Sequence, residues 1–167
     1  MVTATGTKTQ TSLQVLEVVR EVEIAAPTDI VFETVLEQLG PMLTCGEDAP
    51  LLDMKLEPWP GGRWFRDLGN NTGHLWGHVQ SIQPPELLEI HGSMMFSAAV
   101  VSHAVFRLTE ADGLTRIDFS HRAVGLIPEG LRDGADVSAG WVNYFAKLRA
   151  GVEQGLKREH RIEKETL

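Results

Sequence analysis

Residues 51 to 125 consist of short runs in which apolar and polar residues alternate, and a turn signal closes each run. Such alternation is typical of half-buried β-strands, and tight turns join consecutive strands as antiparallel neighbours. An Asp-Gly pair between two alternating runs is a strong hairpin signal. The turn signals are Pro60-Gly61-Gly62, Asn70-Asn71-Thr72-Gly73, Pro84-Pro85 and Ala111-Asp112-Gly113. This half of the chain therefore predicts an antiparallel meander of about six strands.

The residues before this meander predict one further strand and one or two short helices. Leu16 to Ile24 alternates like a strand near its end. Thr28 or Asp29 can cap a helix whose apolar positions follow the 3.6-residue period up to Leu39. A second short helical or irregular piece is expected from about Met42 to Asp48.

A long helix is predicted after the meander, from about Pro128 to His160. Apolar residues recur there at steps of three or four, at Val137, Trp141, Phe145, Leu148 and Val152. The helix also holds three glycines, Gly140, Gly151 and Gly155. Each costs about 1 kcal/mol of helix stability relative to alanine, and close packing against a bulky neighbour is one reason to keep it.

Together these elements predict an α+β fold. A curved antiparallel sheet of about seven strands wraps around the long C-terminal helix, with two short helices after the first strand. Because a helix cannot completely fill the concave side of a twisted sheet, we expect a gap between the two. A single domain is expected over residues 13–160, between a disordered polar tail over residues 1–12 and a frayed charged tail over residues 161–167.

Composition excludes several classes of partner. The chain has 167 residues and a net charge of −8, which disfavours nucleic acid because phosphate binding needs a basic face. No apolar run approaches the roughly 20 residues of a membrane span, so no membrane insertion is expected. The N-terminus lacks the apolar stretch of a secretory signal. Cys45 is the single cysteine, which excludes an internal disulfide and favours a cytoplasmic location.

Four segments resemble the motifs of one family. They are the turn Pro60-Gly61-Gly62-Arg63-Trp64-Phe65, the strand pair from Gly77 to Leu88 with its Pro84-Pro85 turn, the strand from Thr115 to Arg122, and Gly140-Trp141 followed by Phe145 and Leu148. Over about Leu16 to Leu156 the sequence resembles the START-like (SRPBCC) superfamily, in the branch named after the activator of the heat-shock-protein-90 ATPase. The resemblance implies a helix-grip fold, in which the sheet grips the C-terminal helix around an apolar cavity.

This resemblance does not select a function. The superfamily contains lipid carriers, hormone receptors, polyketide cyclases, oxygenase domains and co-chaperones, and fold membership alone does not choose among them. The activator proper carries an additional N-terminal domain that binds the chaperone, and the short tail before Leu13 leaves no room for it. A chaperone partner is therefore one alternative rather than the leading expectation.

Five histidines lie in predicted strands, at positions 74, 78, 91, 103 and 121. His74 and His78 share a face, but four residues along a strand span about 13 Å, whereas metal–ligand bonds are about 2 Å long. A metal site would need histidines from different strands to converge. No cysteine pattern and no His-Glu-x-x-His motif is present. We therefore predict neither a metal nor a cofactor.

His121 is the one histidine with a candidate chemical role. It shares one side of its strand with Ile117 and Phe119, whereas charged and polar residues take the other side. This parity predicts that His121 points toward the core or a cavity. There it could act as a general base or hold the polar end of a ligand, or it could be a hydrogen-bonded core residue.

Strand parity and the helical stripe select the residues expected to line the cavity. They are Leu88, Ile90, Ala104, Phe106, Leu108, Ile117, Phe119, His121, Trp141 and Phe145. Trp64 and Trp76 are interpreted as core residues or as part of the pocket wall. The apolar link from Met94 to Phe96, if exposed, could gate a pocket mouth or form a subunit contact.

Three functions are compatible with this pattern. The leading hypothesis is a non-enzymatic protein that binds a small apolar or amphipathic molecule between the sheet and the helix. The second is an enzyme of the cyclase, hydrolase or lyase type that uses His121 as its base. The third is an interaction module that binds a chaperone or associates with itself as a homodimer.

Overall fold

The computed structural model describes residues 12–46 and 48–165, with side chains described up to Leu156. The elements in chain order are β1 (Gln14–Ile24), α1 (Thr28–Leu39), β2 (Met54–Leu56), β3 (Arg63–Asp67), β4 (Gly73–Gln83), β5 (Leu87–Gly92), β6 (Val100–Ala111), β7 (Leu114–Gly125), the 3₁₀ turn η1 (Glu129–Leu131) and α2 (Ala135–Glu165). The predicted tail over residues 1–12 lies outside this description except for Ser12. The backbone of α2 is helical through Glu165, which includes residues 161–165 of the segment expected to fray, and fraying over residues 161–167 stays a prediction.

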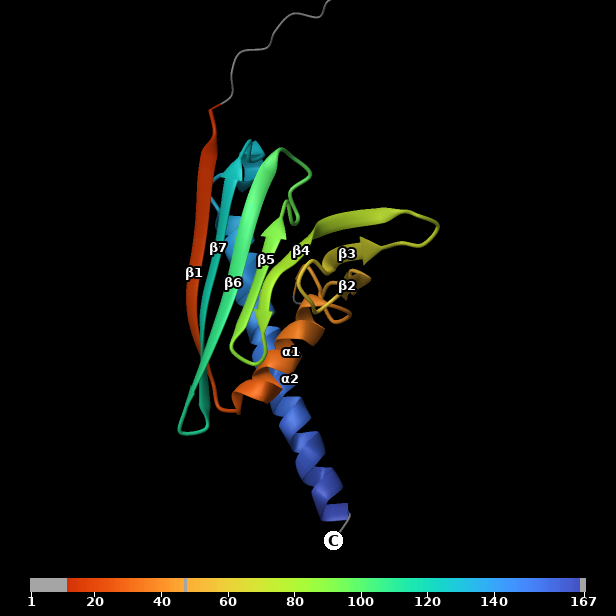
Figure 1. The fold of residues 1–167 in the computed structure, drawn as a ribbon, viewed down its shortest axis with the longest axis vertical. Helices are drawn as coiled ribbons and strands as arrows, with labels where there is room; N and C mark the ends of the chain where they lie inside the picture. Colours follow the sequence, from red (N-terminus) through yellow and green to blue (C-terminus); the bar gives the residue numbers. More distant parts are fainter. Residues whose placement is uncertain (1–11, 47, 166–167) are drawn as a thin grey trace, which may run out of the picture.

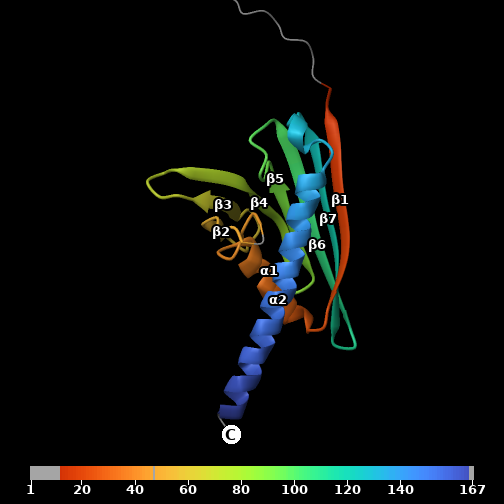
Figure 2. The same ribbon diagram turned by 180° about the vertical axis from the view of Figure 1, so that it is seen from behind.

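All seven strands form one antiparallel sheet in the order β1-β7-β6-β5-β4-β3-β2. The first strand of the chain thus pairs with the last, from Gln14 opposite Gly125 to Ile24 opposite Thr115. Figure 1 shows the sheet from the side away from α2, and Figure 2 shows α2 running across its other face. The predicted α+β helix-grip architecture is therefore confirmed.

The β6–β7 hairpin turns as its sequence predicts. Asp112 and Gly113 are the only two residues between the strands, and their φ angles are 54° and 73°. Positive φ at both central residues is the requirement of a type I′ turn, which matches the right-handed twist of the strands on either side.

The N-terminus of α1 is held differently from the expected cap. Thr28 is already helical, Pro27 occupies the cap position, and no side-chain cap hydrogen bond forms there. The carboxylate of Glu110 on β6 instead accepts hydrogen bonds from the Thr28 backbone N–H at 2.9 Å and from the Thr28 hydroxyl at 3.1 Å. A negative charge at this end also favours the helix dipole.

The second short helix expected near residues 42–48 is not found among the described residues. After α1 the chain forms turns, bends and one isolated bridge between Thr44 and Leu51. Gly40-Pro41 ends α1, and Gly46 and Pro50 disfavour a new helix because glycine and proline both weaken helical structure.

Helices α1 and α2 pack closely at Gly151. A Cβ atom at this position would lie 3.1 Å from Thr34 Cγ2 and 3.3 Å from Gln38 Nε2. Close packing therefore accounts for Gly151, as the sequence predicts. It does not account for Gly140 and Gly155, where an added Cβ atom would have no neighbour within 4 Å.

No helix within the described residues is both long and apolar enough to cross a membrane. The longest, α2, carries one apolar stripe and is otherwise polar, and its C-terminal part extends beyond the sheet (Figures 1 and 2).

We predict that Glu110→Gln lowers the free energy of unfolding by about 1 kcal/mol, because α1 loses a charge-assisted hydrogen bond and a favourable charge at its N-terminus. Chemical denaturation at neutral pH measures the change. Glu153→Gln, which removes an exposed carboxylate from α2, is the matched control and is expected to stay within about 0.5 kcal/mol of the unmodified protein. Equal losses in both variants would contradict this account of α1.

Candidate functional site

A cavity of about 200 Å³ lies where α1 ends, between β3, β4 and the first turns of α2. Its wall is mainly apolar and aromatic and consists of Leu39, Leu43, Thr44, Cys45, Trp64, Trp76, Met95, Leu131, Asp136, Val137, Gly140, Trp141 and Tyr144. Cys45, Asp136 and Gly140 are exposed and form the rim, whereas Leu39 is fully buried and forms the floor. We call this the aromatic cavity.

Two tryptophans from the sheet form one wall of the aromatic cavity. The rings of Trp64 and Trp76 meet edge to face, with centroids 5.0 Å apart. The Trp64 indole N–H donates to the Leu39 carbonyl oxygen at 2.7 Å, and the Trp76 indole N–H donates to His74 Nδ1 at 3.1 Å. Because both indole N–H groups are satisfied by the protein, these side chains offer a ligand their apolar surfaces.

The opposite wall comes from α2, and its polar side-chain groups also have partners in the protein. The Trp141 indole N–H donates to His121 Nδ1 at 3.0 Å, and the Tyr144 hydroxyl donates to the Val35 carbonyl oxygen at 3.3 Å. Burial raises the pKa of Tyr144 well above its ordinary value, so its hydroxyl is neutral at physiological pH.

A lysine on α2 holds the loop that closes one side of the aromatic cavity. Lys147 Nζ donates to the Gly46 carbonyl oxygen at 2.6 Å and to the Thr44 hydroxyl. These bonds join α2 to a loop about 100 residues earlier in the chain. The loop therefore stays against the helix although it contains no regular helix or strand.

His121 is fully buried on β7 and points toward the core, as strand parity predicts. Its Nδ1 accepts the Trp141 N–H, so the neutral ring carries its own proton on Nε2, which has no partner among the described residues. Desolvation lowers the pKa of His121 from 6.5 to about 4. The imidazole is therefore neutral at physiological pH, and its hydrogen bond to Trp141 joins it to the wall of the aromatic cavity.

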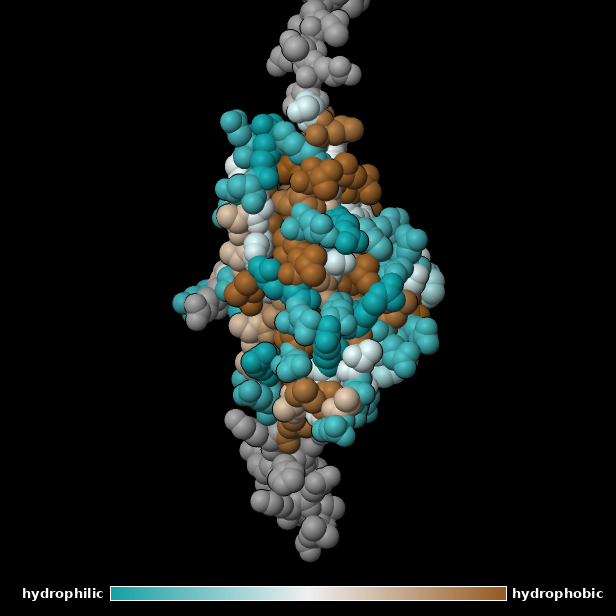
Figure 3. Space-filling view, turned by 90° about the vertical axis from the view of Figure 1, so that its left-hand side faces the viewer, coloured by the Kyte–Doolittle hydropathy of each residue, from teal (hydrophilic) through white to brown (hydrophobic). Residues whose placement is uncertain are grey.

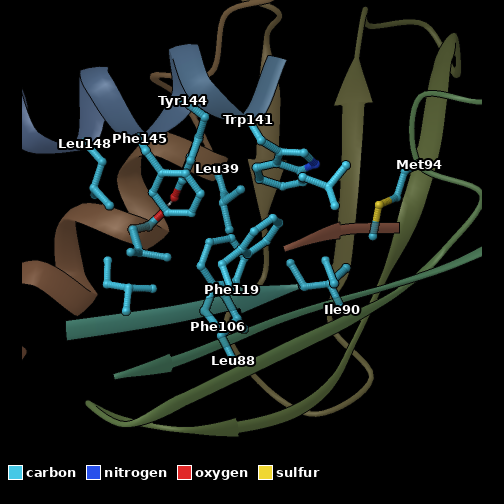
Figure 4. Packing of buried hydrophobic residues seen from close by; sticks show 14 of the residues in the cluster. Leu39, Leu88, Ile90, Met94, Phe106, Phe119, Trp141, Tyr144, Phe145 and Leu148 are labelled. Atoms are coloured by element: carbon cyan, nitrogen blue, oxygen red, sulfur yellow. Dashed lines mark hydrogen bonds between the residues drawn. The ribbon is translucent and has the colours of Figure 1, made fainter. Parts of the chain in front are cut away.

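Aromatic side chains fill the space between the middle of the sheet and α2 (Figure 4). Phe119 lies at the centre of this cluster. Its ring centroid is 4.8 Å from that of Phe106, 4.4 Å from that of Trp141 and 5.2 Å from that of Phe145. These distances are those of favourable tilted and edge-to-face pairs. At these separations the rings are in contact with one another.

All ten residues predicted to line the cavity are buried, but only one lies on its wall. Trp141 lines the aromatic cavity. The other nine, Leu88, Ile90, Ala104, Phe106, Leu108, Ile117, Phe119, His121 and Phe145, lie in the packed core outside it. Their role in ligand binding stays a prediction, and the empty space lies nearer to α1 than strand parity indicates.

Several wall residues were not predicted from the sequence. Val137 and Tyr144 lie on α2 within one turn of Trp141, so the helical stripe is the signal that leads to them. Leu43, Thr44 and Cys45 carry no such signal, because they belong to an irregular loop whose position depends on contacts made far along the chain.

The apolar link from Met94 to Phe96 is less exposed than the gate or subunit contact that we considered. Met94 and Phe96 are buried, and Met95 is partly buried on the cavity wall. Exposed apolar side chains instead gather along the β1 edge (Figure 3), where Val15, Val124 and Val101 occupy paired positions on three neighbouring strands.

No group of three or more histidine, cysteine, aspartate or glutamate side chains within the described residues is arranged to hold a metal ion. Cys45 is exposed at the cavity rim. Asp136 is the charged residue of the described wall, and it also lies on the rim.

We predict that His121→Gln flattens the pH dependence of stability between pH 6.5 and about 4. In that window the unfolded histidine takes up a proton that the folded one does not, so the free energy of unfolding falls as the pH falls. This contribution is about 2 kcal/mol at pH 5. Gln keeps an acceptor for Trp141. Denaturant unfolding at pH 7 and pH 5 measures the free energy of unfolding of each protein. An equal change in this free energy between the two pH values in both proteins would contradict the assignment.

Comparison with solved structures shows the same fold at low sequence identity. A protein from Rhizobium leguminosarum is 20% identical with a TM-score of 0.66, and the match covers 86% of this chain and 97% of that one. CalU16 from Micromonospora echinospora is 18% identical with a TM-score of 0.56, covering 93% and 92%. DynU16, a protein of the dynemicin biosynthetic locus, is 17% identical with a TM-score of 0.55, covering 83% and 48%. No curated protein matches the chain.

The family comparison covers most of the chain. The family described as "Activator of Hsp90 ATPase homolog 1-like protein" matches residues 26–153, from just after β1 into α2. The match agrees with the motifs around Pro60-Gly61-Gly62, Pro84-Pro85 and Gly140-Trp141 and with the helix-grip architecture. The protein belongs to the activator of Hsp90 ATPase homolog 1-like family, within the START-like (SRPBCC) superfamily.

Proposed function

We propose that this protein binds a small apolar or amphipathic molecule in the aromatic cavity. The observation that carries the proposal is a space of about 200 Å³ walled by three tryptophans, a tyrosine and aliphatic side chains. The polar atoms of Trp64, Trp76, Trp141 and Tyr144 already have protein partners. An apolar group can therefore bind without breaking the hydrogen bonds of these wall side chains.

The size of the cavity limits the part of the ligand that can be buried. A cavity of about 150 Å³ is large enough for benzene, whereas pockets for drug-sized ligands measure about 300–1,000 Å³. The aromatic cavity therefore suits one ring system or the apolar end of a longer molecule. Its exposed rim, at Cys45, Asp136 and Gly140, leaves the polar end of such a molecule in solvent.

The position of His121 favours binding over acid–base chemistry at this residue. Its imidazole lies outside the cavity wall, and its pKa of about 4 makes it a weak base at neutral pH. A chaperone or a second copy of the chain as a partner would have to use another surface, because the aromatic cavity is shaped for a small molecule.

A pair of glycine variants on α2 tests the proposal. We predict that Gly140→Leu lowers the affinity for the neutral fluorescent probe N-phenyl-1-naphthylamine by at least about tenfold, because the added side chain takes up the cavity or its mouth. Gly155→Leu is the matched control. Both positions lie on α2 with open space around an added Cβ atom, but Gly155 does not line the cavity.

Both variants are expected to unfold no more easily than the unmodified protein, because leucine favours a helix over glycine by about 0.8 kcal/mol. A Gly140→Leu protein that is folded and binds the probe as tightly as the unmodified protein would overturn the assigned site. Native mass spectrometry of freshly purified protein, compared with its denatured mass, identifies any molecule that is bound already.

A further inference from the structure

Three histidines lie on the neighbouring strands β4, β5 and β6. The outer face of this sheet, away from α2, is the face seen in Figure 1. His91 of β5 is in register with His78 of β4 on one side and with His103 of β6 on the other. Val79 follows His78 and Ile90 precedes His91, and both are buried on the inner face. Alternation therefore turns the three imidazoles outward, where His78 is half-buried and the other two are exposed.

The first two of these histidines are close enough to share an ion. The ring centroids of His78 and His91 are 6.0 Å apart, and the ring planes differ by 31°. Two imidazoles on one tetrahedral zinc ion, each with a bond of about 2.0 Å, place their centroids about 5 Å apart. The pair would have to close by about 1 Å, which side-chain rotation supplies without moving either strand.

The charges around this row do not oppose a cation. Arg63 and Arg122 flank the row on β3 and β7 and are each paired with a carboxylate. Arg63 Nε donates to Glu57 Oε2 at 3.0 Å, and Arg122 Nε donates to Glu17 Oε1 at 2.7 Å. The chain as a whole carries a net charge of −8, which raises the local concentration of cations.

We propose that His78 and His91 form a chelating pair for a divalent transition-metal ion such as Zn²⁺, with water completing the coordination. Imidazole nitrogen is a preferred ligand of zinc, copper and nickel. No third protein ligand converges on the pair in the described residues, so the site is open rather than a closed four-ligand site. The bound ion links β4 to β5 on the face opposite the aromatic cavity, so this proposal does not depend on the proposed function.

Zinc titration of the full, tag-free chain at pH 7.5 tests the pair, because metal binding needs neutral imidazoles. His78→Gln and His91→Gln are each expected to lower the Zn²⁺ affinity by at least about tenfold, since either change converts a chelate into a single ligand. His103→Gln, on the same face and the next strand, is the matched control and is expected to change the affinity by less than about threefold.

Two further measurements separate the site from general attraction to the acidic chain. Mg²⁺ prefers oxygen ligands, so it should bind all four proteins equally weakly. Imidazole ¹⁵N shifts should move on Zn²⁺ addition for residues 78 and 91 and less for residue 103. Unchanged Zn²⁺ affinity in His78→Gln and His91→Gln would overturn the proposal, and so would an equal loss in all three variants.

Discussion

The buried contact between Trp141 of α2 and His121 of β7 fixes how the helix sits on the sheet. An indole N–H inside an apolar core must find an acceptor, since leaving it unpaired costs about 1–3 kcal/mol. Here that acceptor is His121 Nδ1 at 3.0 Å. The indole ring also packs against Phe119, with the two ring centroids 4.4 Å apart. This hydrogen bond and this ring contact favour one rotation of α2 about its axis, which the Tyr144–Val35 and Lys147–Gly46 hydrogen bonds also hold. This rotation decides that Val137 and Tyr144 face the cavity.

The aromatic cavity follows from the mismatch between a curved sheet and a helix. Where the two come closest, Phe106, Phe119 and Phe145 fill the space with rings in contact. Toward the first turns of α2 the sheet bends away with β3 and β4 (Figures 1 and 2), and the helix presents the small residues Val137 and Gly140 to the cavity there. The end of α1 and the loop held by Lys147 close that side instead. The cavity is thus the part of the interface that side-chain volume does not fill.

Alternation was enough to predict which side chains of β5, β6 and β7 face inward, because a strand has a period of two and most charged side chains of these strands lie on one side. It could not locate the cavity. That location depends on how bulky rings such as Phe106 and Phe119 pack together, and on a loop whose position is set by Lys147, about 100 residues away in the chain. The N-terminus of α1 shows the same limit, since its partner Glu110 lies 82 residues from Thr28.

Cross-strand register is the other quantity that a single sequence does not contain. The spacing of His74 and His78 along one strand argues against a shared ion, but it says nothing of the neighbour of His78 on the next strand, His91. A bulge in β4 shifts the pairing with β5 between Val79 and Ser81, and the register around it places His78 opposite His91. A bulge in the pairing of β3 with β4 likewise places Gly77 rather than Trp76 opposite Trp64. Trp76 and His78 are two residues apart, so regular alternation would place them on the same face. The bulge leaves Trp76 as the extra residue between Leu75 and Gly77, so Trp76 can line the cavity while His78 points outward opposite His91.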